Sequence, residues 1–205
     1  METKHISQRY RRIDGLRAFA SIGIVLMHIQ ANADYQLTGI VAERVIPSFA
    51  NLVFLFMIIS GFSVCCGYYD NIVSGKMPLD VFYKKRFAKA WPLFAILCII
   101  DLIVSPSLES LYEVLANLTL SFGFIPNHDI GVIGVGWFLG LVFVFYYLFP
   151  FFCYLLSDRK RAWISFCVTM LLNFLCVVYF EAGRTSIAYS AVFFMAGGML
   201  DLYRD

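Results

Sequence analysis

The sequence contains little charge for its length. Only 15% of its 205 residues are charged, whereas charged residues make up about 25% of an ordinary soluble domain. Hydrophobic residues account for 60% of the chain, above the roughly 45–50% that is usual in soluble proteins. Internal repeats and low-complexity segments are also missing. These features leave no room for a separate soluble domain, and we expect a lipid bilayer rather than a nucleic acid as the surroundings of the chain.

The cysteines lack the spacing of a metal site. No C-x-x-C or C-x-x-H pattern occurs, and all the cysteines lie in apolar stretches, where cysteine usually acts as a small packing residue. We therefore expect neither a metal site nor a disulfide framework. The residues concerned are Cys65, Cys66, Cys98, Cys153, Cys167 and Cys176.

What the chain does contain is a series of apolar stretches, most of them near the roughly 18 residues that cross a bilayer. They predict an all-α fold, a polytopic transmembrane helix bundle of about six spans that forms one membrane-embedded domain over residues 1–205. Residues 105–133 hold two glutamates and turn-like clusters, which predicts a helix and loop on the outer face, with a seventh span as the alternative. The expected spans are 14–31, 47–68, 91–104, 134–156, 162–180 and 186–203.

The basic residues predict the orientation of these spans. Of the 16 Lys and Arg residues, all except Arg44 and Arg184 fall in the N-terminal arm, after the second and fourth spans, or after the sixth. Because Lys and Arg near span ends are retained in the cytoplasm, both termini are predicted to be cytoplasmic. The apolar core behind the basic arm is too long for a typical cleaved signal peptide, and no A-x-A cleavage site follows it.

The first expected span carries three ionisable residues. Arg17 and His28 are eleven residues apart, so they lie within ~20° of the same helix face and roughly 16 Å apart along the axis. Asp14 precedes Arg17 by three residues and can pair with it. Since ionisable groups in a span are costly unless they face protein or water, we expect Arg17 and His28 to line an interior cavity. The simpler alternatives are that Arg17 reaches the headgroups and that His28 makes an inter-helix hydrogen bond.

A second group of basic residues lies in FYKKRFAKAWPLF, residues 82–94. Lys85, Arg86 and Lys89 would share one helix face, and Trp91 with Pro92 is predicted to mark the start of the third span. The cluster could serve as an anchor to anionic lipid. It could also bind a phosphorylated cytoplasmic donor, for which guanidinium forks are suited.

Four motifs follow one another in a specific order. They are DGLRA at 14–18 with the later His28, FMIISGF at 56–62, the basic cluster closing on Trp-Pro, and GWFLGLVFVFYYLFP at 136–150. In order and spacing they resemble acyltransferase family 3, a family of integral-membrane acyltransferases. The resemblance extends over almost the whole chain.

The resemblance implies transfer of an acyl group, usually acetyl, from cytoplasmic acyl-CoA to a hydroxyl of a cell-surface or lipid-linked saccharide. It also implies a multi-pass protein of the plasma or inner membrane that holds no bound cofactor. His28 and Arg17 would be the catalytic residues: the histidine as general base, the arginine as a ligand of donor phosphate or of developing negative charge. The implied donor- and substrate-binding residues are Asp14, Ser60, Gly61, Lys85, Arg86, Lys89 and Trp137.

Two departures from the family pattern keep other functions open. Val142 stands where many members have a glutamate, five residues after the tryptophan. Members also typically have more spans, so we expect the chain to match the N-terminal part of the family domain. The alternatives are a truncated, inactive protein or a partner subunit of the same fold. A small transporter is a third possibility, although no inverted repeat is recognisable.

The predicted topology can be tested by labelling cysteines introduced into a cysteine-free variant with a membrane-impermeant maleimide. We expect Asp129→Cys to react in intact cells, because residues 105–133 are predicted to lie outside. Cysteines placed in the 70–90 and 157–162 segments should react only after the cells are opened. If position 129 were labelled only after the cells had been opened, the predicted orientation would be wrong.

Overall fold

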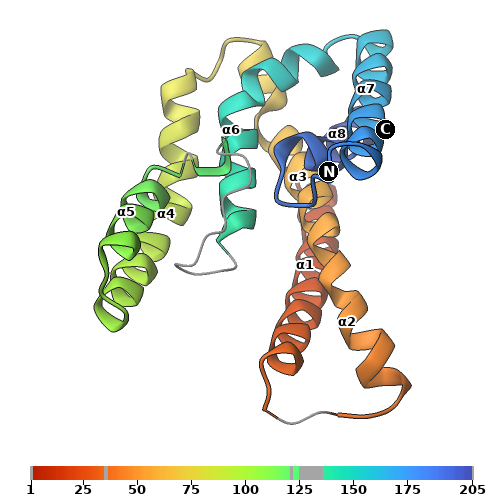
Figure 1. The fold of residues 1–205 in the computed structure, drawn as a ribbon. Coiled ribbons are helices and arrows are strands. Elements are labelled where there is room, and N and C mark those ends of the chain that lie inside the picture. Colours follow the sequence, from red (N-terminus) through yellow and green to blue (C-terminus); the bar gives the residue numbers. More distant parts are fainter. Residues whose placement is uncertain (1, 35–36, 121, 125–135, 205) are drawn as a thin grey trace.

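A computed structural model describes residues 2–34, 37–120, 122–124 and 136–204, and every regular element in them is a helix (Figure 1). Within these residues, five segments are long and apolar enough to cross a membrane: Arg12–Ala31, Val41–Val73, Leu79–Val104, Trp137–Leu156 and Arg159–Val178. A sixth apolar helix has 16 residues and is shorter than a typical span. The predicted polytopic helical bundle is thus confirmed.

The long helices are α1 (Glu2–Ala31), α3 (Leu52–Val73), α4 (Leu79–Val104), α5 (Leu108–Leu118), α6 (Trp137–Leu156), α7 (Arg159–Val178) and α8 (Ile187–Leu202), and the short ones are η1 (Val41–Val45), α2 (Ile46–Ser48), η2 (Phe49–Asn51) and η3 (Phe122–Phe124).

The third span begins earlier than the sequence predicted. Helix α4 starts at Leu79, so the basic cluster belongs to the helix and Pro92 lies inside it. The prediction that Trp91 and Pro92 mark the start of the span is therefore wrong. Lysine, arginine and alanine are strong helix formers, and they carry the helix through the segment before the proline. The second span also extends further toward the N-terminus, to Val41.

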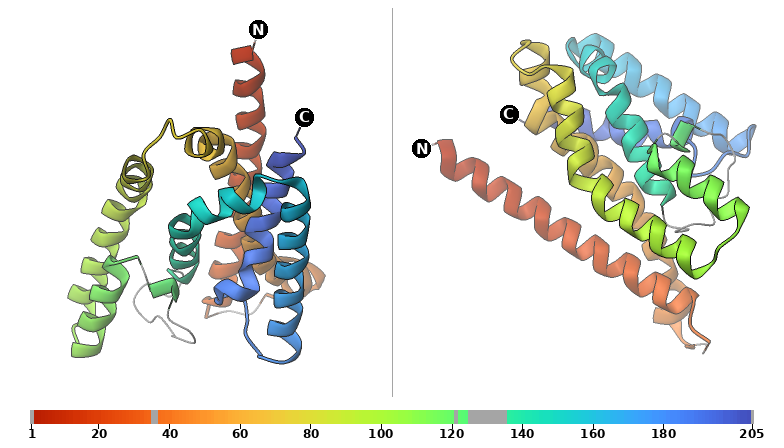
Figure 2. Two further views of the ribbon diagram at one scale, coloured as in Figure 1. Left: turned by 90° about the horizontal axis from the view of Figure 1, so that it is seen from above. Right: turned by 90° about the vertical axis from the view of Figure 1, so that its left-hand side faces the viewer.

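The helices run up and down between two ends of the molecule (Figure 2). The start of α1, the α3–α4 and α6–α7 connections and the C-terminus lie at one end, which we call the basic end because most lysines and arginines are there. The connections after α1, α4 and α7 lie at the opposite end. This arrangement agrees with the alternation of basic loops in the sequence.

Close packing of α8 against α3 holds the centre of the bundle together. A methyl group on Gly61 would collide with the backbone carbonyl of Phe194, and one on Gly197 would collide with that of Ile58. Small residues allow such backbone approach between helices in a membrane. Beside this contact, the ring of Phe145 on α6 stacks on that of Phe194, with centroids 4.5 Å apart.

Helix α5, in the segment predicted to form a helix and loop on the outer face, runs back along α4 (Figure 2). Trp91 lies near the middle of α4, about 18 Å from either end at 1.5 Å per residue, and its indole Nε1 donates to the carbonyl of Leu118 at 2.8 Å. The Tyr147 hydroxyl donates to the carbonyl of Thr119 at 3.4 Å. Carbonyls at a helix end need such partners where water is absent. Leu120 and Phe122, which follow α5, are buried in a core cluster with Phe94 of α4 and Phe143 of α6. Residues 121 and 125–133 lie outside the described part of the chain, and the placement of the segment on the outer face stays a prediction.

Candidate functional site

Arg17 is fixed on the bundle-facing side of α1 by a bond to α3. Its Nη2 donates to the Ser63 hydroxyl at 2.7 Å, and its Nη1 lies 3.3 Å from a carboxylate oxygen of Asp14. Asp14 is largely exposed, and exposed ion pairs of this kind contribute about 0–1 kcal/mol. The contact with Ser63 is therefore the one that directs the guanidinium toward the interior, and it leaves part of a five-donor fork to face a ligand.

Arg86 projects from α4 into a group of aromatic rings. The carbon at the centre of its guanidinium lies 4.3 Å from the ring centroid of Tyr68, 5.1 Å from that of Tyr146 and 5.9 Å from that of Phe82. Cation–π attraction is strong in such a water-poor setting. The Nε atom is buried, and none of the described residues accepts a hydrogen bond from it. The guanidinium is thus held by its faces, with a polar edge that still needs an acceptor.

Tyr146 of α6 connects the two arginines. Its ring lies 5.1 Å from the guanidinium carbon of Arg86, and its hydroxyl interacts electrostatically with both Arg86 and Arg17, so side chains from α1, α4 and α6 influence one another in the half of the bundle near the basic end. We call Arg17, Arg86 and Tyr146 the arginine site. Lys85 and Lys89 are exposed, and no contact joins them to these three residues in the part of the chain that the structure describes.

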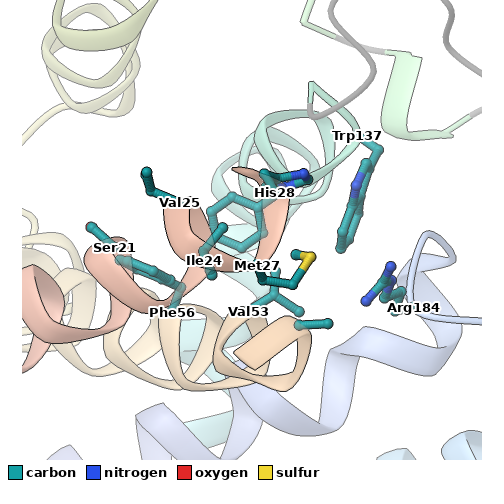
Figure 3. Close-up of a pocket in the computed structure, with 11 residues that line it drawn as sticks. Ser21, Ile24, Val25, Met27, His28, Val53, Phe56, Trp137 and Arg184 are labelled. Carbon is teal, nitrogen blue, oxygen red and sulfur yellow. The ribbon is translucent and has the colours of Figure 1, made fainter. Parts of the chain in front are cut away.

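His28 lies toward the opposite end, in a pocket of about 340 Å³ (Figure 3). That volume is within the range of small-molecule sites. Trp137, at the start of α6, forms one wall, and its indole lies between His28 and Arg184. The lining residues are Ser21, Ile24, Val25, Met27, His28, Ala50, Val53, Phe56, Trp137, Phe138 and Arg184.

The structure brings only some of the predicted site residues together. His28 and Trp137 share the pocket, whereas Arg17 is not among its lining residues. The expectation that Arg17 and His28 line one cavity is therefore not met by this pocket, and the two side chains lie at different places along the same helix. Ser60 and Gly61 do not line it either, since Gly61 is used in the contact with α8. Val142, at the position of the family glutamate, is buried in the hydrophobic core.

The sequence analysis missed three neighbours of the two arginines and the charged residue of the pocket. The neighbours of the arginines come together only when four helices pack, so no local sequence pattern predicts them. They are Ser63 and Tyr68 on α3 and Tyr146 on α6. Arg184 did carry a signal. It is one of two arginines on the side where the positive-inside rule predicts few.

Comparison with known protein families agrees with this architecture. The model of the acyltransferase domain, acyltransferase family 3, matches residues 10–205. The chain belongs to acyltransferase family 3. No curated protein and no solved structure matched it. Membership makes this acyltransferase a multi-pass membrane enzyme, as the resemblance in the sequence implied, and places both the arginine site and the His28 pocket inside the family domain.

Proposed function

We propose that this acyltransferase moves an acyl group, most simply acetyl, from acyl-CoA at the basic end to a hydroxyl of a saccharide in the His28 pocket. The observation that carries the proposal is the arrangement along α1. Arg17 belongs to a cationic site near one end of the bundle, and His28 lines a pocket toward the other, roughly 16 Å further along the helix. An extended pantetheine arm has a length on this scale. The basic end would then face the cytoplasm of a plasma or inner membrane.

The arginine site supports binding of the donor. CoA carries several phosphate oxygens, and planar guanidinium forks bind such oxygens with two parallel hydrogen bonds. Arg86 and Arg17 place two such guanidinium groups near the basic end, and the Nε of Arg86 has no acceptor among the described residues. Lys85 and Lys89, exposed on α4, contribute at most attraction at the surface. CoA enters as a substrate in this scheme, and no resident cofactor takes part.

The pocket supports binding of the acceptor. Trp137 presents a flat apolar surface to one side of a pyranose ring, and His28 supplies a polar group where a hydroxyl would lie. A cell-surface polysaccharide and a lipid-linked saccharide both present such rings.

In the reaction that follows, His28 acts as the general base. Its unprotonated ring nitrogen takes the proton of the acceptor hydroxyl while the hydroxyl oxygen attacks the thioester carbonyl. The new C–O ester bond forms, the C–S bond breaks, and the CoA thiolate leaves and takes up the proton. The separation of Arg17 from His28 favours the phosphate-binding role for Arg17, because both side chains cannot touch one reacting carbonyl.

The base role predicts that His28→Gln inserts and folds normally but lowers kcat by roughly 10²-fold, since glutamine cannot accept the proton at neutral pH. The measurement is transfer of label from acetyl-CoA to saccharide by membranes carrying equal amounts of each protein. Asn32→Gln is the matched control, because this exposed residue lies one turn further on and, among the described residues, bonds the His28 backbone carbonyl. Normal turnover in His28→Gln would make the histidine a structural residue.

The donor role predicts that Arg86→Gln raises the KM for acetyl-CoA by about tenfold, the effect of losing roughly 1.4 kcal/mol of binding. Lys85→Gln, one residue earlier but exposed, should leave KM close to its original value. Arg17→Lys should also weaken binding of the donor, because the point charge of lysine does not replace the planar fork of arginine. Arg12→Lys should leave donor binding unchanged. Equal effects of Arg86→Gln and Lys85→Gln would reduce the cluster to a membrane anchor.

A further inference from the structure

We infer that the His28 pocket recognises an anionic saccharide and that Arg184 is the residue that binds its negative group. This inference rests on the proposed function and specifies the class of acceptor. An acidic sugar, with a carboxylate or a phosphate close to the acylated hydroxyl, is the ligand that fits.

The first observation is the position of Arg184. It lies in the connection between α7 and α8, and its guanidinium carbon is 5.5 Å from the ring centroid of Trp137, at the wall of the pocket (Figure 3). Stacking on the indole keeps the guanidinium beside the pocket. The backbone is held as well, because the buried Ser190 hydroxyl donates to the Arg184 carbonyl at 2.9 Å. Arg184 is exposed, so the Trp137 ring and the held backbone are what keep its guanidinium near the pocket, which lowers the entropic cost of binding.

The second observation is the charge of the pocket. None of its lining residues is acidic, and Arg184 is the one lining residue with a permanent charge. In the part of the chain that the structure describes, no carboxylate forms an ion pair with it, including the nearby Glu181. A guanidinium without a carboxylate partner, at the edge of a mostly apolar pocket, provides a binding site for an anion.

The third observation is the order of the side chains. The Trp137 indole lies between His28 and Arg184 (Figure 3). A sugar ring stacked on the indole would direct substituents toward both neighbours. A hydroxyl would face His28, and a carboxylate or phosphate on another carbon of the same ring would face the Arg184 fork. Charge recognition and proton removal would thus act on one ring.

The inference predicts a difference in affinity between two sugars that differ in charge at one carbon. Methyl β-D-glucuronide and methyl β-D-glucoside are titrated against the chain in phosphatidylcholine nanodiscs, and Kd is measured by saturation-transfer-difference NMR. We expect the Kd of the glucuronide to be about tenfold lower than that of the glucoside, and added salt to reduce the difference. Arg184→Gln should remove the preference and leave glucoside binding unchanged.

Two further variants make the result specific. Arg44→Gln removes the other arginine of the opposite end, which does not line the pocket, and should keep the preference for glucuronide. Trp137→Ala should weaken binding of both sugars, since stacking on the indole does not depend on the charge of the sugar. Equal affinity for the two sugars, an unchanged preference in Arg184→Gln, or no binding of glucuronide would each overturn the inference.

Lipid headgroups are the other source of anions at this position. Repeating the titration in discs that contain phosphatidylglycerol should leave the glucuronide preference in place. Its loss would show that Arg184 binds lipid phosphate and would also overturn the inference. Because binding is measured without turnover, a protein that transfers acetyl groups but binds both sugars alike would contradict the role of Arg184 and leave the proposed function standing.

Discussion

The cost of placing polar groups away from water is the constraint on which the rest of this structure depends. In a bilayer every guanidinium, carbonyl and imidazole must find a partner inside the protein or line a cavity. Arg17 reaches Ser63, Arg86 lies among aromatic rings, and the carbonyls at the end of α5 accept from Trp91 and Tyr147. Each of these contacts joins two helices, so meeting the polar requirement also fixes how the helices pack.

The same constraint explains why α1 has an apolar side and a side with ionisable residues. Its apolar residues Phe19, Ile22 and Ile29 are exposed and suited to lipid, whereas Arg17 and His28 are half-buried on the side toward α3. One rigid helix therefore carries a cationic site near one end and a pocket toward the other. A transferase that takes its donor from one side of a membrane and its acceptor from the other needs that separation.

The sequence was sufficient for the helical class and for the up-and-down order of the helices, because hydropathy and basic loops are local properties. It failed at Trp91 and Pro92, since a proline can be accommodated inside a helix whose preceding residues favour helix. It did not indicate that α5 packs along α4, because the composition of a short helix does not show which neighbour it contacts. The contacts of Tyr146 and Arg184 depend on packing between distant segments, which no local pattern contains.

The measurement that tests the account most directly is transfer across a sealed membrane. Right-side-out vesicles carrying the chain are loaded with labelled acetyl-CoA in the lumen, which corresponds to the cytoplasm, and the saccharide is supplied outside. The account predicts label on the external saccharide when the donor is in the lumen, and none when the donor is outside the vesicles. Labelling that requires donor and acceptor on the same side would contradict the assignment of the arginine site and the His28 pocket to opposite sides of the membrane.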